Sequence, residues 1–457
     1  MPMPRQLPHA EVHEPARTVP VFGAYDVVVL GGGPAGIAAA ASAARNGASV
    51  LLVERYGFLG GMGTAAGVTN FCGLHANVFG EIRQVVHGVA DDLLARMRSL
   101  DGLNQPHLVL GKIWAQAYDM AALKCAADAL LLDAGVNLLF HALGAGVTLD
   151  DDGNIASLLL ETRSGRVAVL AQVFIDCSGD ADIACWSGVA YEKGTGAGEM
   201  MYPTLMFKVG HVDAAAAGDA WRTIPERMKQ AQEAGAYRFP RHGAIVRPMK
   251  NPYEWRVNVT QLAAPDGSAV DGTDATALSA GEVEGRRQAL DYLRFLREQV
   301  PGFGQAYILD IPPQLGIRET RRVVCETMLT GEDVLNCARF DDSIGVNGWP
   351  LEKHVAGNVV WEWPPIPGSC GYNQLPYRML LPRRANGATP TNLLVAGRCA
   401  GMTHEGQSAA RVSGACFVMG EAAGAAAALA LGGNRSVYDV EAGSLRRALI
   451  SQGVFLG

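Results

Sequence analysis

The sequence lacks the features that mark several large classes of protein. It has no Cys-x-x-Cys pair among its nine cysteines, so iron–sulfur and zinc-finger spacing is absent and we expect no metal site. It has no basic stripe, and with a net charge of -7 we expect no nucleic-acid partner. Its longest run of small apolar residues, 422–431, falls well short of the ~20 residues of a membrane span, so we expect a buried helix and no span.

The beginning of the sequence also lacks an apolar signal core, because residues 1–20 are rich in proline and charge. We expect a frayed arm at residues 1–24 and, since the cysteines are scattered and odd in number, reduced thiols in the cytoplasm. With 457 residues, 49% of them hydrophobic, the chain has room for two large domains. The composition leaves the oligomeric state open, and a homo-oligomer is one of the alternatives.

The clearest pattern is a strand–helix–strand unit near the start of the chain. A buried strand, an alanine-rich helix and a second strand are predicted over residues 25–30, 37–46 and 49–54. The loop before the helix carries a Gly-x-Gly-x-x-Gly pattern, which is made with its neighbours by Gly31, Gly33, Pro34, Ala35 and Gly36. These glycines permit the turn, the approach of a pyrophosphate and close packing of helix on strand. The unit therefore predicts a Rossmann-type dinucleotide site.

The residues after the second strand favour FAD over NAD. Glu54 ends that strand, where a carboxylate can bind ribose hydroxyl groups and would repel a 2′-phosphate. A glycine-rich loop follows, whereas NAD-only Rossmann domains usually continue into an ordinary helix. Its backbone amides can approach a second phosphate or a flavin, with a flexible surface turn as the alternative. We therefore expect further FAD contacts from Arg55, Gly60, Gly61 and Met62.

The rest of the pattern predicts an α/β fold with an insertion. Helices are expected at residues 86–99 and 115–134, and strands at 136–140, 155–162 and 167–175. The middle of the chain changes character, and the Rossmann pattern resumes near the end with a strand at 392–397 and a long helix at 408–431. We expect a Rossmann-type FAD-binding domain (25–195 and 390–457) with an inserted, mixed α+β substrate or cap domain (196–389).

Four further stretches, in order along the chain, carry a family resemblance. Residues 175–182 resemble an Ala-Thr-Gly-Asp-Gly-Asp turn with Ser178 in the threonine place, and residues 316–322 resemble a Gly-x-Arg-Glu-Thr-Arg segment. Residues 372–378 resemble an Ile-Pro-Tyr-Arg segment, and residues 394–411 an Ala-Gly-Arg-Cys…Arg block. Over residues 25–431 the chain resembles the FAD-dependent oxidoreductase family of the glutathione-reductase-type flavoprotein superfamily. The resemblance implies FAD contacts from Gly179, Asp180, Gly397, Arg398 and Arg411.

Candidate catalytic residues follow from the chemistry of a flavin. Removing a hydride from a C–H next to O or N needs a base, and His354 and His404 are the candidates, with a solvated or capping histidine as the alternative. Arg318 and Arg378 can clamp a carboxylate, although Glu319 among the neighbouring arginines could equally form a structural ion-pair network. Further contacts to the substrate are expected from Tyr372, Tyr377 and Gln407.

These observations predict an FAD-dependent dehydrogenase or oxidase for a small polar metabolite, with an anionic one among the options. Without a second Gly-x-Gly-x-x-Gly pattern for NAD(P)H, the acceptor is expected to be oxygen, a quinone or a redox protein. The alternatives are a flavin monooxygenase reduced by external NAD(P)H, an NAD-only dehydrogenase and a non-catalytic electron-relay subunit. A covalent flavin link through Cys72 or His75 is weighed against a plain buried thiol and a surface histidine.

Overall fold

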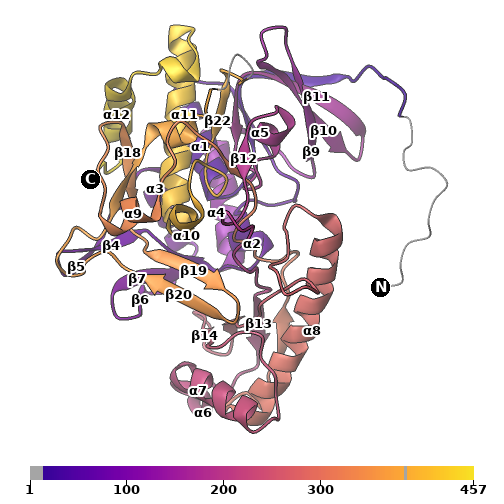
Figure 1. The fold of residues 1–457 in the computed structure, drawn as a ribbon, viewed down its shortest axis with the longest axis vertical. Coiled ribbons are helices and arrows are strands. Elements are labelled where there is room, and N and C mark those ends of the chain that lie inside the picture. Colours follow the sequence, from indigo (N-terminus) through magenta and orange to yellow (C-terminus); the bar gives the residue numbers. More distant parts are fainter. Residues whose placement is uncertain (1–13, 385–388) are drawn as a thin grey trace.

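A computed structural model describes residues 14–384 and 389–457 (Figure 1). The predicted arm at 1–24 lies partly outside these residues, and its last part differs from the prediction. β1 (Val21–Leu30) begins four residues before Tyr25, because its first residues pair with β11 (Gly165–Asp176). The arm therefore ends where the sheet begins.

A seven-stranded sheet organises the first part of the molecule. Its order is β8-β2-β1-β11-β10-β9, with β22 paired to β11. The pairs that join β8, β2, β1, β11 and β22 are parallel, whereas β9, β10 and β11 are joined by antiparallel pairs. The remaining bounds are β2 (Val50–Val53), β8 (Asn137–Leu139), β9 (Leu143–Leu149), β10 (Ile155–Thr162) and β22 (Leu393–Val395). This arrangement confirms the predicted Rossmann-type α/β class.

Two small-residue helices pack against this sheet and against each other. They are α1 (Pro34–Arg45) and α11 (Ser413–Gly433). A Cβ atom at Gly420 would lie 2.0 Å from the carbonyl oxygen of Ala35, so glycine allows the helices to touch backbone to backbone. α11 is long and apolar enough to cross a membrane, but 83% of its most apolar window is buried in the molecule, as predicted for a core helix.

Two helix boundaries differ from the prediction. The helix expected at 408–431 is divided into α10 (His404–Ala410) and α11, because Val412 between them is extended. The helix expected at 115–134 starts later, since β7 (Ile113–Ala117) occupies its first residues. α4 (Met120–Asp133) begins after Asp119, whose side chain accepts a hydrogen bond from the backbone N–H of Ala122. α3 (Val89–Ser99) packs beside α4.

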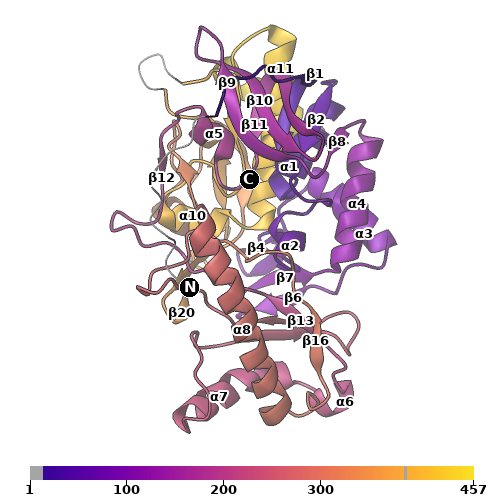
Figure 2. The same cartoon turned by 90° about the vertical axis from the view of Figure 1, so that its right-hand side faces the viewer.

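A second hydrophobic core forms from residues between Leu205 and Ile317, around the sheet β14-β15-β13-β16 and the long helix α8 (Figure 2). Its elements are β13 (Phe207–Gly210), α6 (Ala214–Ala217), α7 (Ala220–Glu233), β14 (Ile245–Pro248), β15 (Trp255–Asn258), α8 (Ala275–Gln299) and β16 (Tyr307–Asp310). Most buried hydrophobic residues from Val323 to Leu381 belong to the first core instead, because β18 (Ser343–Asn347) packs on α11, while Trp349 belongs to a small third cluster. The expected insertion at 196–389 is thus shared between the two cores.

Short strands fill the space between these two parts. The small sheet β3-β7-β6 and two hairpins, β4–β5 and β19–β20, lie there, while β18 pairs with β21. Their bounds are β3 (Asn70–Phe71), β4 (His75–Val78), β5 (Glu81–Gln84), β6 (His107–Val109), β18 (Ser343–Asn347), β19 (Leu351–Val355), β20 (Asn358–Glu362) and β21 (Asn373–Pro376). The middle of the chain therefore supplies four of these short strands, β18 to β21.

Candidate functional site

One large cavity, of about 560 Å³, is walled by residues of both cores. One half of its lining comes from the loops after β1 and β2 and from the segment after β22. The other half comes from β14, β15 and β19 and from the segment at 316–318. We call these the dinucleotide half and the β19 half.

The glycine loop after β1 builds an anion site in the dinucleotide half. α1 begins at Pro34 with Gly33 as its N-cap and no side-chain cap, so the backbone N–H groups of the first turn are left for a ligand. Gly31, Gly33, Pro34 and Ala35 line the cavity. Gly36 does not; a Cβ there would lie 1.8 Å from the carbonyl oxygen of Gly31, so this glycine allows the helix to sit on the strand end.

Glu54 is buried at the end of β2 and lines the cavity. Its Oε2 accepts a hydrogen bond from the N–H of Gly32 at 2.7 Å, and its Oε1 accepts one from Tyr56 at 3.0 Å. Each oxygen keeps capacity for a second donor, as a ribose hydroxyl requires. In the next loop Gly61 and Met62 line the cavity, whereas Gly60 holds the loop in place by donating its N–H to the carbonyl of Gly32 at 2.8 Å.

The far end of this half is held by a paired arginine. Arg398 lies 2.9 Å from the carboxylate of Asp180, which also accepts a hydrogen bond from Thr320 at 2.8 Å. Gly179, Gly397 and Arg398 line the cavity, and Asp180 positions Arg398 from behind. Arg55 lines it too, with its guanidinium donating to Gln314 at 3.1 Å. Each residue of this half predicted to contact FAD thus lines the cavity or holds a residue that does, so the residues present fit a dinucleotide.

A histidine and a glutamate share one face of β19 in the other half. His354 Nε2 lies 3.0 Å from Glu352 Oε1, and the indole N–H of Trp349 donates to Glu352 Oε2 at 2.9 Å. Burial alone would raise the pKa of Glu352, but the hydrogen bond from His354 and the neighbouring charges, Arg411 among them, hold the pKa below its usual value. Burial, then the charge of Arg318, lowers the pKa of His354 well below its usual value. The ring is therefore neutral and donates Nε2–H to an ionised carboxylate.

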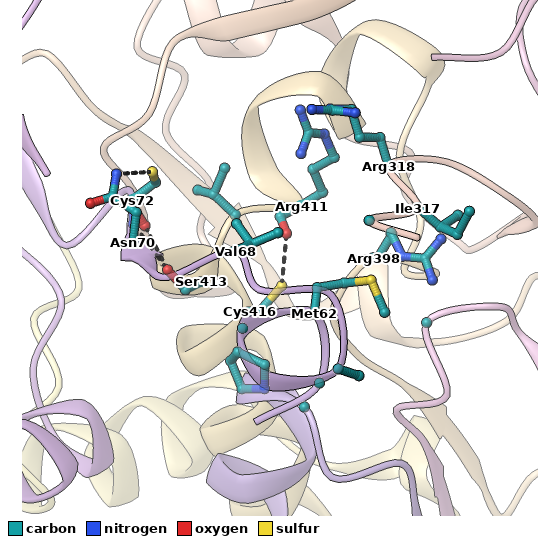
Figure 3. Close-up of a pocket in the computed structure, with 18 of the residues that line it drawn as sticks. Met62, Val68, Asn70, Cys72, Ile317, Arg318, Arg398, Arg411, Ser413 and Cys416 are labelled. Atoms are coloured by element: carbon teal, nitrogen blue, oxygen red, sulfur yellow. Dashed lines mark hydrogen bonds between the residues drawn. The ribbon is translucent and has the colours of Figure 1, made fainter. Parts of the chain in front are cut away.

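Arginines surround this pair. Arg318 and Arg411 line the cavity close to one another (Figure 3), and Arg241 lies on the same side. Arg318 is buried, and its guanidinium donates to the carbonyl of Tyr202 and the hydroxyl of Thr204, at 2.7 and 2.6 Å. Burial, then the charges of Arg411 and Arg241, lowers the pKa of Arg318. Nε of Arg241 and of Arg411 is buried and finds no hydrogen-bond partner among the described residues.

Sequence reasoning missed Arg241 and the part played by Glu352. Arg241 lies in no motif, and only the packing of its loop brings it to the cavity. The signal for Glu352 was present, because residues i and i+2 of a strand face the same way and Glu352 stands two positions before the candidate base.

Three residues expected to contact the substrate lie outside the cavity lining. The hydroxyl of Tyr377 donates to the carbonyl of Val437 at 2.7 Å in the core, and Tyr372 packs on the ring of Phe455. Arg378 pairs with Asp342 at 3.0 Å. Tyr372, before β21, and Tyr377, which begins η1 (Tyr377–Leu380), thus meet the C-terminal segment, which sequence alone did not place beside them, whereas Arg378 meets the residue before β18.

His404 and Gln407 are also corrected. His404 begins α10 rather than lying in a loop, and its Nδ1 is 2.9 Å from buried Glu319, which also pairs with Arg322. The structural ion-pair network considered for Glu319 is thus present, and His404 belongs to it. Gln407 is fully buried and donates to the carbonyl of Arg398 at 2.8 Å, so it supports the cavity wall from outside.

The two residues considered for a covalent link differ in position. Cys72 lines the cavity beside Asn70 and Ser413 (Figure 3), and burial raises the pKa of its thiol to about 12. His75 is buried against Trp114 outside the cavity lining. Cys72 is therefore a protonated thiol, a poor nucleophile.

The comparisons with known proteins agree with this geometry at the level of a family. The model of a family described as FAD dependent oxidoreductase matches residues 26–449. No curated protein matches the sequence.

Solved structures with related folds are distant. A geranylgeranyl bacteriochlorophyll reductase-like protein from Thermoplasma acidophilum is 15% identical with a TM-score of 0.46, over 95% of this chain and 84% of that one. The p-nitrophenol 4-monooxygenase of Pseudomonas putida is 14% identical with a TM-score of 0.47, over 94% and 86%. The anhydrotetracycline hydroxylase of Streptomyces rimosus is 15% identical with a TM-score of 0.42, over 94% and 69%. Likenesses this weak carry no argument about the reaction.

Proposed function

Because the chain belongs to the FAD-dependent oxidoreductase family, we propose that it is a dehydrogenase or oxidase of a small anionic metabolite. It would remove a hydride from a C–H bond next to an oxygen or nitrogen. The observation that carries the proposal is the neutral His354, held by Glu352 among Arg318 and Arg411 in the cavity that the dinucleotide half completes. When bound, FAD supplies the two-electron acceptor for the hydride.

His354 is suited to take the proton that such an oxidation releases. Its Nε2–H is committed to Glu352, and among residues 14–384 and 389–457 its Nδ1 has no hydrogen-bond partner. Nδ1 can therefore accept a proton from a substrate O–H or N–H. The ionised Glu352 would stabilise the imidazolium that results, as a carboxylate does behind a histidine base.

Arg318 and Arg411 are suited to orient the substrate, and for Arg411 this proposed role replaces the FAD contact that the family resemblance implies. A carboxylate placed between their guanidinium groups would receive charge-assisted hydrogen bonds beside the buried Arg318. It would also relieve the repulsion that lowers the pKa of Arg318. This would fix the C–H bond relative to both the dinucleotide half and His354.

We further propose a cytoplasmic location, which the nine unpaired cysteines support.

The test is anaerobic mixing of the FAD-loaded protein with α-hydroxy and α-amino carboxylic acids, followed by flavin absorbance. We expect one class to bleach the flavin, and His354→Gln to slow bleaching by about 10²- to 10⁴-fold without changing flavin content. Lys353→Gln is the matched control, because Lys353 is on the same strand but pairs with Glu362 away from the cavity. If instead no acid bleaches the flavin but NADPH does so in the presence of an aromatic substrate, the result would support the monooxygenase alternative and overturn the proposal.

A further inference from the structure

A second group of arginines lies in the β19 half of the cavity, apart from Arg318 and Arg411. Arg247 on β14 and Arg256 on β15 are directly opposed in the antiparallel pair of strands, and both line the cavity. Burial, and then Arg411 and Arg241, lowers the pKa of Arg318, whereas burial and Arg247 lower the pKa of Arg256. The pKa of Arg256 thus responds to Arg247 and not to Arg318 or Arg411, while burial and then Arg222 lower the pKa of Arg247.

This second group has no anionic partner of its own. Among the residues that the structure describes, neither Arg247 nor Arg256 forms an ion pair, and Nε of Arg256 is buried without any partner. Arg256 is 4% exposed, and within residues 14–384 and 389–457 it donates only to the carbonyl of Thr69, at 3.2 Å, and to the ring of His107, at 3.4 Å. His107 accepts this contact because burial, then the two arginine charges, lowers its pKa to about 4.

Such an arrangement is costly unless an anion completes it. Like charges directly opposite each other on one face of a sheet destabilise it. A buried guanidinium without a carboxylate carries the desolvation cost of its charge with no Coulombic return. Arg247 lessens its own cost only in part, by stacking at 3.7 Å on the ring of Trp221. An anionic oxygen group between the two guanidinium groups would reverse both costs.

We propose that Arg247 and Arg256 bind a second anionic group, a carboxylate or a phosphate, so that the substrate is a dianion held at both ends. The inference rests on the proposed function, because Arg318 and Arg411 are taken to hold the first carboxylate. The length of the substrate is then set by the span between the two arginine groups. The neutral His107 contributes an acceptor that fixes the orientation of Arg256.

The test measures binding and does not depend on turnover. Isothermal titration calorimetry of the FAD-loaded protein compares succinate, glutarate and adipate with the monocarboxylates of the same length, and inorganic phosphate forms a separate arm. We expect one dicarboxylate, or phosphate, to bind at least about tenfold tighter than the monocarboxylates, the scale of one charge-assisted contact. In Arg247→Gln and in Arg256→Gln this preference should disappear.

Arg222→Gln is the matched control, since Arg222 stacks on the same Trp221 ring, at 4.5 Å, but does not line the cavity. It should keep the preference. Equal binding of mono- and dianions by the wild type, with phosphate no tighter, or a preference that survives in both cavity variants, would overturn the inference. Flavin bleaching by a monoanion, with no preference for dianions, would support the proposed function and contradict the second anion site. Tight binding of a dianion without any bleaching would support the second anion site and contradict the proposed function.

Discussion

Arg398, in the dinucleotide half of the cavity, pairs with Asp180. In the part of the chain that the structure describes, Arg241 and Arg256 of the β19 half donate only to neutral groups, and each leaves a buried Nε without a partner. The first half is balanced in charge before any ligand binds, and it offers backbone N–H groups to a pyrophosphate. In the second half the ionised Glu352, 4.0 Å from Arg411, offsets only one of the arginine charges, so the remaining positive charge is balanced only when an anion enters. The contrast indicates that the dinucleotide half is stable without a ligand. In the β19 half, unpaired buried arginines destabilise the free protein, and this cost is recovered when an anionic substrate binds.

The largest effect should come from breaking the dinucleotide half. Gly33→Glu places a carboxylate at the N-terminus of α1, where we expect the pyrophosphate, although its Cβ makes only an ordinary contact of 3.7 Å with the Cα of Gly61. The purified variant should lose nearly all flavin absorbance. Gly304→Ala, at a position with open space, should keep it. Normal flavin content in Gly33→Glu would contradict the site.

Breaking the β19 half should leave the cofactor in place. Glu352→Gln removes the charge that stabilises a protonated His354, so flavin reduction should slow by about 10²-fold at unchanged flavin content. Because the pKa of Glu352 is about 2, the wild-type rate should show no ionisation of this group near neutral pH. Stopped-flow reduction measures the rate, with Glu362→Gln on β20 as control. Equal rates in both variants would remove Glu352 from the mechanism.

A matched pair of substitutions sharpens the contrast in charge balance. Arg398→Met leaves the nearly buried carboxylate of Asp180 without its ion-pair partner, so the free energy of unfolding should fall by about 3–5 kcal/mol. Arg241→Met removes a buried charge that has only Asn258 as partner, so the melting temperature should hold or rise. Thermal unfolding with and without FAD gives both values. Similar losses in the two variants would show that the halves do not differ in this way.

A buried carboxyl outside both halves calibrates these electrostatic effects. Burial raises the pKa of Glu421 on α11 to about 8, so the folded protein keeps a proton that the unfolded chain releases above about 4.5. Stability is fully present below that lower value and falls as pH rises toward 8, by at most about 1.4 kcal/mol per pH unit. Glu421→Gln keeps the hydrogen bond from Val89 and should flatten this slope in melts across the range. An unchanged slope would mean that another group causes it.

The smallest effect concerns a residue that the sequence placed at the site and the structure does not. Tyr377→Phe removes one buried hydrogen bond to Val437, so the free energy of unfolding should fall by about 1 kcal/mol. Flavin content and the rate of flavin reduction should stay at the wild-type level. Tyr253→Phe, at an exposed position, is the control for stability. A slower reduction in Tyr377→Phe alone would return this residue to the site.

The dinucleotide half could be predicted because its information is local. β1, the glycine loop, α1, β2 and Glu54 are contiguous, and each glycine has a backbone reason to be where it is. The β19 half could be predicted only in part. His354 and Arg318 were identified from nearby motifs, but the same reasoning also chose His404, Tyr377 and Arg378, because a motif does not say which way a side chain turns.

The sequence by itself determined the class of fold, the dinucleotide loop and the family, because short-range periodicity and backbone geometry are written in neighbouring residues. Tertiary structure alone decided which arginines meet. Arg241, Arg256, Arg318 and Arg411 come from four separate segments, and only packing of the second core against the first brings them to one cavity. The excess of positive charge there arises from that packing. An unpaired guanidinium group is costly only when it is removed from water, and a single stretch of sequence does not show which side chains are buried.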